Sequence, residues 1–172
     1  MALGRPRPHV RVERGEKLLA EAAATQGYVG GSRDALYVVR GLGGGGFDLA
    51  ETLRIPWEEV EAADWDAETS TLRVTEVGSW GEERPEHVFT LPEPGRLLEL
   101  VRERVTASIV LQRHVAIRGR KGLRVVARRP PYGDREISWI YEYDEGVDPD
   151  DPAVRQAAEE ALAAARDEVG LD

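Results

Sequence analysis

Cysteine is absent from this 172-residue chain. Without cysteine the protein forms no disulfide framework, no cysteine-ligated metal site and no thiol nucleophile. Long apolar runs are also missing, because no stretch approaches the roughly 18 apolar residues of a membrane span. The opening residues "MALGRPRPHVRVERGEK" lack the continuous apolar core of a signal peptide. We therefore expect a cytoplasmic protein without a transmembrane segment.

Positive charge is scarce and unevenly placed. The formal net charge is -9 and the isoelectric point is near 5.0, which argues against general affinity for nucleic acid. Residues 113–130, "RHVAIRGRKGLRVVARRP", nevertheless hold seven Arg or Lys residues and no acid. The rest of the chain then carries -16, so this one stretch stands out as a candidate anion-binding surface.

Short β-rich segments separated by turn signals fill the first part of the chain. Hydrophobic residues make up 41% and charged residues 32%, which is typical of a globular protein. Turn signals about every ten residues predict an antiparallel meander or a small barrel. The segments that we expect to be strands include "DALYVVR", "TLRIPW", "STLRVTEV" and "HVFTL".

The apolar period changes from two to about four after Pro94. Leu97, Val101, Val105 and Ile109 recur every four residues, which predicts one face of an amphipathic helix. We therefore expect an irregular N-terminus over residues 1–14 and a run of strands closed by one helix over 15–112.

This pattern resembles the bacterial pleckstrin-homology-like (PH-like or GRAM-like) domains, and an actinobacterial protein family of that type. The resemblance covers about 100 residues and implies a bent antiparallel barrel closed by an amphipathic helix. It implies a binding or scaffolding module rather than an enzyme. The segments that carry it are "GEKLLA", "DALYVV", "RIPWEEVEAADWD", "STLRVTEV" and "LLELVRERVTASIVLQRHV".

Residues 113–172 lie outside the resemblance and predict a β-β-β-α extension, packed on or beside the PH-like part. Two strands joined by "RGRKG" are followed by a third after "PPYG", and a helix closes the segment. Asp151 is a good N-cap, Pro152 suits the first turn and Gly170 suits the C-terminal end. The whole chain is therefore expected to be mainly β (α+β).

Two motifs have the composition of ligand sites but not their context. Gly41, Gly43 and Gly46 satisfy G-x-G-x-x-G, yet no helix follows to present its N-terminal amides to a phosphate. A cluster of acids in "EGVDPDDP" lacks EF-hand spacing, and acids are expected ahead of a helix. We therefore expect a pliant loop and a helix cap, with no metal and no cofactor.

Catalytic patterns are weak. Glu83, Glu86 and His87 place a histidine near carboxylates, a pairing that can serve acid–base chemistry. Such clusters are also common on exposed loops. No serine lies in a nucleophile elbow, and no Walker, H-E-x-x-H or kinase motif occurs. We expect no enzymatic activity, although a triad assembled in space stays open.

The basic run is open to two interpretations. Its cations either bind a phospholipid headgroup, nucleic-acid phosphates or an acidic patch on a protein, or are neutralised by acids on a neighbouring strand. If "PPYG" forms a hairpin whose paired residue numbers sum to about 266, Arg124 faces Glu142 and Val126 faces Ile140. The candidate anion-binding residues are Arg118, Arg120, Lys121, Arg124, Arg128 and Arg129.

A tryptophan in a polar loop is the remaining candidate. Trp57 and Trp139 fall on predicted apolar faces and are expected in the core. Trp80 lies in a Gly- and Glu-rich loop, where it is either an interface anchor or a lid over the barrel mouth. The favoured function is a non-enzymatic interaction or scaffolding module that binds another protein or a second copy of itself. Binding of an anionic ligand through the hairpin is the alternative, and an enzyme of unknown type is third.

Overall fold

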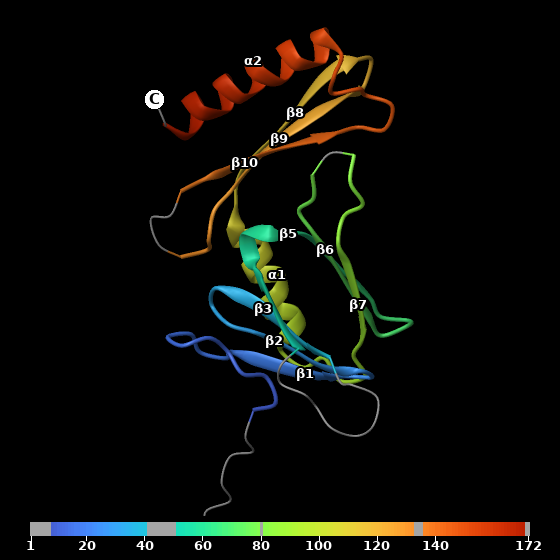
Figure 1. Cartoon of the computed structure of the whole chain (residues 1–172), viewed down its shortest axis with the longest axis vertical. Coiled ribbons are helices and arrows are strands. Elements are labelled where there is room, and N and C mark those ends of the chain that lie inside the picture. Colours follow the sequence, from blue (N-terminus) through green and yellow to red (C-terminus); the bar gives the residue numbers. More distant parts are fainter. Residues whose placement is uncertain (1–7, 41–50, 80, 133–135, 171–172) are drawn as a thin grey trace, which may run out of the picture. The chain divides into compact units, whose positions relative to one another are not determined.

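The computed structural model is mainly β, with three antiparallel sheets and two α-helices (Figure 1). It describes residues 8–40, 51–79, 81–132 and 136–170. The chain divides into two compact units, Met1–Ala107 with Pro130–Gly133, and Ser108–Arg129 with Asp134–Asp172. No helix in the described ranges is both long and apolar enough to cross a membrane.

The first unit contains a four-stranded and a three-stranded sheet. The first sheet has the order β1-β2-β3-β4, formed by β1 (Ala20–Ala24), β2 (Gly27–Gly31), β3 (Ala35–Arg40) and β4 (Thr52–Pro56). A 3₁₀ turn, η2 (Trp57–Glu59), leads to the second sheet, which has the order β5-β6-β7, formed by β5 (Val60–Asp66), β6 (Thr71–Glu76) and β7 (Glu86–Thr90).

The core of this unit lies between the two sheets and the helix α1 (Leu97–Ser108), beside which β3 and β5 run in Figure 1. Leu97 and Val101 supply the helix face, and the indole of Trp57 is fully buried. Gly31 permits the close approach of α1 to β2, because a Cβ there would lie 2.7 Å from Leu100 Cδ2. The absence of a side chain at Gly31 therefore lets the helix pack closely on the sheet.

The sheets do not join into one closed barrel among the described residues. Outside the sheet pairings, a hydrogen bond of 3.1 Å runs from Thr25 N, after β1, to Thr90 O of β7. The order of seven strands followed by a helix is as expected, but the closed barrel is not present in this form.

The helix expected over Leu97, Val101, Val105 and Ile109 is present, but Ile109 does not belong to it. The helix ends at Ser108, and Ile109 begins the next strand, opposite Arg128. Ile109 is β-branched and its strand pairing places it in β8. An apolar period of four residues cannot predict that pairing. The first unit accordingly ends at Ala107, ahead of the boundary expected at residue 112.

The N-terminal segment is irregular but firmly packed. Val10 is 1% exposed and forms a second cluster with Tyr37 and Val39 on the other face of the first sheet. Gly30 provides the room, because a Cβ there would lie 2.9 Å from Leu18 and 3.1 Å from Val10. This segment therefore covers the sheet face that the core does not use.

The second unit is the expected β-β-β-α arrangement. Its strands have the order β10-β9-β8, formed by β8 (Ile109–Arg118), β9 (Lys121–Arg128) and β10 (Ser138–Tyr143), and the helix is α2 (Pro152–Val169). The predicted register is confirmed, because Arg124 pairs with Glu142 and Val126 with Ile140.

The helix α2 covers one face of this sheet, as Figure 1 shows for β8 and β9. Asp151 Oδ1 accepts from Ala153 N, Pro152 occupies the first turn and Gly170 adopts the left-handed conformation, all as predicted. The buried stripe is Val154, Ala158, Ala161 and Ala165. It packs on Leu123 and Val125, with Val115, Ile117, Trp139, Tyr141 and Tyr143 around them.

Candidate functional site

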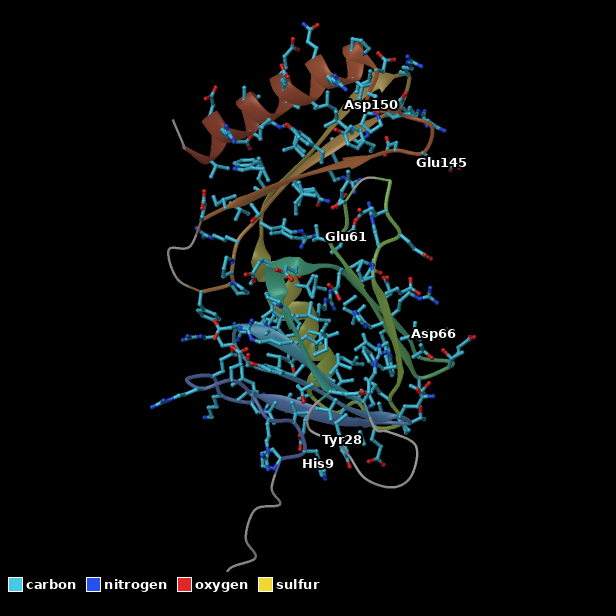
Figure 2. The ribbon with its side chains drawn as sticks, in the orientation of Figure 1. His9, Tyr28, Glu61, Asp66, Glu145 and Asp150 are labelled. Atoms are coloured by element: carbon cyan, nitrogen blue, oxygen red, sulfur yellow. The ribbon has the colours of Figure 1, made fainter. Side chains whose placement is uncertain are left out.

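Two of the three cations at the β8–β9 turn, Arg118 and Lys121, already have partners. Arg118 Nη2 lies 2.6 Å from Asp151 Oδ2, and Lys121 Nζ donates to Glu145 O at 3.1 Å. Both partners come from the segment that precedes α2, near the positions of Glu145 and Asp150 in Figure 2. Arg118 is therefore paired with a carboxylate, and Lys121 is held by a backbone carbonyl.

Three other cations of the run, Arg113, Arg124 and Arg128, also have partners. Arg124 Nη1 contacts Glu142 Oε2 at 3.4 Å, Arg113 pairs with Glu168, and Arg128 is 2% exposed with Nη1 3.4 Å from Ser108 Oγ. In the described part of the chain, Arg120 and Arg129 are the members of the run whose side chains have no ion pair or hydrogen bond.

Those two arginines do not converge on one ligand. They flank the two ends of β9, and a strand rises about 3.3 Å per residue, so roughly 30 Å of extended chain separates them. A single phosphate group accepts hydrogen bonds only from donors within about 3 Å. The six predicted anion-binding residues thus share a hairpin but are not assembled around one site.

The acids of "EGVDPDDP" support the start of α2. Asp148 Oδ1 accepts from Asp150 N at 2.9 Å, Asp151 caps the helix and Asp150 pairs with Arg155 at 3.0 Å. Among the residues that the structure describes, no group of three or more histidine or acidic side chains is arranged to hold a metal ion.

Two histidines, His87 and His114, have carboxylate partners. His87 Nε2 lies 2.6 Å from Glu76 Oε1, and its Nδ1 lies 3.2 Å from Arg40 Nη2. Because a guanidinium only donates, Nδ1 must accept, so the proton of the neutral ring resides on Nε2 and is donated to Glu76. His114 Nε2 contacts Asp144 Oδ2 at 2.9 Å.

Neither ring meets the geometry of a nucleophile–base pair. In the described ranges, no serine, threonine or tyrosine hydroxyl is hydrogen-bonded to His87 or His114. Asp144 also accepts from Gly122 N at 2.8 Å, and these bonds from His114 and Gly122 hold its carboxyl pKa below the ordinary value. The contacts of Asp144 with His114 and Gly122 fix the end of the hairpin.

A buried polar network, which sequence patterns do not reveal, lies on the first sheet. Glu16 accepts hydrogen bonds from Ser32 Oγ, from Tyr37 Oη at 2.9 Å and from Arg54. Burial opposes ionisation of Glu16, but the hydrogen bonds from Ser32, Arg54 and Tyr37 outweigh it and hold its pKa below the ordinary value. Ser32 is fully buried, so the network fastens the N-terminal segment and offers no access to a substrate.

The loop candidates fall on residues outside the described ranges. These are Trp80 and the glycine motif of Gly41, Gly43 and Gly46. The other tryptophans are described: Trp57 donates from Nε1 to Ser32 O at 3.1 Å, and Trp139 packs in the core under α2. Trp65 is half-buried on β5.

The feature with the properties of a binding site is an apolar groove beside Trp65. Its volume is about 460 Å³, and it runs between β5, β6 and α1. Five of its seven lining residues are apolar, and they are Ala63, Trp65, Leu72, Leu98 and Val101, accompanied by Glu99 and Arg102. We call it the β5–α1 groove.

The strand at this groove is the edge of its sheet. Within the described residues, β6 is the one strand that pairs with β5, so no described strand lies along the other side of Ala62–Asp66. A bulge between Val60 and Ala62 interrupts the pairing at the start of the strand. Figure 2 labels Glu61 and Asp66 near the two ends of this edge.

A second cavity, of about 280 Å³, adjoins the turn between β1 and β2 and strand β7. Arg40 lines it, and residues 41–50, which follow, lie outside the described ranges. The β5–α1 groove has the more apolar lining of the two and lies on an edge strand, and it is therefore the candidate site.

Comparison with known proteins finds no matching family model, no matching curated protein and no matching solved structure.

Proposed function

We propose that the first unit is a non-enzymatic interaction module that binds an extended segment of another protein in the β5–α1 groove. The bound segment adds to the sheet as a strand beside β5 and places alternate side chains in the groove. The observation that carries this proposal is that β5, an edge strand of its sheet, also lines an apolar groove. Backbone bonds then supply affinity and the groove supplies selectivity, as in other strand-addition complexes.

The order of the elements supports a relationship to PH-like domains. Seven antiparallel strands in two sheets precede a single helix whose Leu97 and Val101 enter the core between the sheets. That arrangement is the one that the resemblance implies, and such domains serve as binding modules. The relationship is part of the proposal, since the fold alone does not define a function.

Strand β4, at one edge of the first sheet, suits strand addition less well. Strand β4 ends in Pro56, which has no backbone N–H to donate, and Arg54 on that strand is committed to Glu16. Binding of an anionic ligand through the basic hairpin is disfavoured because Arg118 and Arg124 already have carboxylate partners. A protein partner therefore fits the described surfaces best.

The groove sets the expected strength of binding. Four backbone hydrogen bonds contribute about 1 kcal/mol each, and one or two buried aliphatic side chains add about 1.5–3 kcal/mol each. Ordering of the peptide and loss of its free motion remove several kcal/mol. We expect dissociation constants in the range of about 10 to 100 µM.

Selection of random nine-residue peptides displayed on phage tests the proposal. We expect enriched peptides to bind the wild-type chain and to lose at least about tenfold in affinity with Leu98→Glu, which places a charge in the groove. The matched control is Leu53→Glu, because Leu53 is 41% exposed on β4 and does not line the groove.

A second groove variant, Ala63→Gln, keeps the test decisive if Leu98→Glu fails to fold. Circular dichroism and thermal unfolding establish that each variant is folded. Failure to enrich any peptide, or enriched peptides that bind Leu98→Glu and Ala63→Gln as tightly as the wild type, would contradict the proposed function.

A further inference from the structure

The β5 edge of the second sheet is strongly acidic. Residues 58–68 include no basic residue. They carry six carboxylates, on Glu58, Glu59, Glu61, Asp64, Asp66 and Glu68. A peptide that pairs with this edge comes within a few ångströms of several of them, because adjacent strands lie about 4.8 Å apart.

Part of this charge is neutralised within the unit. Arg84 Nη1 contacts both carboxylate oxygens of Glu61, at 2.5 and 2.6 Å. Arg73 is the cross-strand neighbour of Asp64, but its guanidinium donates to Glu86 at 3.1 Å. Arg84 therefore neutralises Glu61, whereas Arg73 is paired with Glu86 and not with Asp64.

The other carboxylates of residues 58–68 outnumber the cations near them. Burial and the neighbouring carboxylates of Glu58 and Glu76 raise the pKa of Glu59 above its ordinary value. Asp66 stays ionised, because Thr69 and the backbone amide of Glu68 donate to its side chain and lower its pKa. A cation that arrives at this edge meets carboxylates that lack a full complement of counter-charge.

Side-chain parity divides the edge into an apolar and an acidic face. Successive side chains of a strand point to opposite faces. Ala63 and Trp65 line the groove, so Asp64 and Asp66 lie on the opposite face, and both are exposed. An added strand has the same alternation, with one set of side chains over the groove and the other beside the two aspartates.

We propose that the segment bound at β5 alternates apolar and basic side chains, with the apolar set in the groove and the basic set beside Asp64 and Asp66. This inference rests on the proposed strand addition at the same edge. Opposite charges on directly facing strand positions stabilise the pairing, and like charges oppose it. The partner is therefore a cationic, extended segment of another protein.

Repulsion between like charges excludes a second copy of this edge as the occupant. Two β5 strands paired antiparallel would bring Asp64 and Asp66 of one copy beside the aspartates of the other. Charged edge strands are a common means by which proteins prevent this kind of self-association. The acidic face thus selects against the chain itself while it attracts a basic partner.

Three eight-residue peptides, capped at both ends and labelled with a fluorophore, test the inference by anisotropy with the full chain. One alternates leucine or valine with lysine, and the others have threonine or glutamate in place of lysine. We expect the lysine peptide to bind about fivefold or more tightly than the threonine peptide at low salt, with the glutamate peptide the weakest. The difference should shrink at 300 mM salt, where exposed charges are screened.

Variants that remove the charges of Asp64 and Asp66 test whether these residues cause the preference for lysine. Asp64→Asn with Asp66→Asn should remove the preference for lysine, and asparagine at 66 retains an acceptor for the turn. The matched control, Glu159→Gln with Glu160→Gln, removes two exposed charges on α2 and should leave the preference intact. If both double variants lose the preference for the lysine peptide equally, the assignment of that preference to the β5 edge is wrong.

The outcomes separate the inference from the function on which it rests. If the threonine peptide binds as tightly as the lysine peptide and both lose binding with Leu98→Glu, strand addition stands and the basic preference is wrong. If none of the three peptides binds, the result counts against strand addition itself.

Discussion

Glu16 Oε1 lies 3.0 Å from Nε and 2.5 Å from Nη2 of Arg54. This pair joins the N-terminal segment to β4, and the same carboxylate accepts from Ser32 and Tyr37. The side chain of Glu16 is 9% exposed, so little water is present to replace these donors. The Glu16–Arg54 pair therefore anchors the N-terminal segment to the first sheet.

We expect Glu16→Gln to lower the free energy of unfolding by about 2 kcal/mol, because hydrogen bonds to a charged group contribute about 1.5–3 kcal/mol. Urea denaturation measures it. The control is Glu13→Gln, whose carboxylate is also near Arg54, at 3.5 Å, but is 66% exposed. That change should cost less than about 0.5 kcal/mol, and equal losses for the two variants would contradict the account.

The stabilisation from Glu16 should depend on pH with a defined sign. Its pKa is lowered in the folded protein by the bonds from Ser32, Arg54 and Tyr37, whereas a free glutamate titrates near about 4.3. The advantage of the wild type over Glu16→Gln is therefore complete above about pH 4.3 and declines as the pH falls through the lower, folded-state pKa.

Urea denaturation of both proteins at pH 7, 4 and 3 checks this dependence. The difference between their unfolding free energies should narrow in acid. A difference that is constant across this range, or that widens below pH 4, would show that ionisation of Glu16 is not the source of its effect.

Gly122 should be the least replaceable glycine of the β8–β9 hairpin. A Cβ at this position would lie 1.8 Å from the carbonyl oxygen of Val115, a backbone atom that cannot move aside. Gly122→Ala should destabilise the protein by about 3 kcal/mol or more. Gly119→Ala is the control in the same hairpin, because its Cβ meets open space and its positive φ of 64° costs only about 1 kcal/mol.

Thermal and urea unfolding compare the two glycine variants. Similar stabilities for Gly122→Ala and Gly119→Ala would mean that the two strands are not as close at Gly122 as described.

The Arg124–Glu142 pair should contribute only modestly. The two side chains face each other across β9 and β10, but Arg124 is 42% exposed. A double-mutant cycle with Arg124→Ala and Glu142→Ala should give a coupling energy of about 0.2–1 kcal/mol, reduced by salt. Zero coupling at low salt would mean that the facing charges do not interact in solution.

The sequence predicts the second unit in more detail than the first. The hairpin register follows from alternation, because a shift by one residue would turn Leu123, Val125 and Trp139 away from α2. The ends of α2 follow from Asp151, Pro152 and Gly170, each of which acts through its immediate neighbours. The hairpin register and the ends of α2 depend on neighbouring residues, so they can be predicted from a single sequence.

Long-range features are not predictable in this way. Glu16 meets Ser32, Tyr37 and Arg54 across 16 to 38 residues, and nothing in the local pattern pairs them. The β5–α1 groove is likewise missed, because Ala63 and Leu98 come together only when helix and sheet pack. The basic run stands out in the sequence because its partners, Asp151 and Glu142, lie on other elements.

Amide hydrogen exchange of the full chain, with and without the lysine-alternating peptide, tests strand addition at β5 most directly. The account predicts slower exchange for the amides within Val60–Asp66 that point away from β6, with β9 and β10 unchanged. Protection at the basic hairpin or elsewhere, with the β5 amides unaffected by bound peptide, would contradict it.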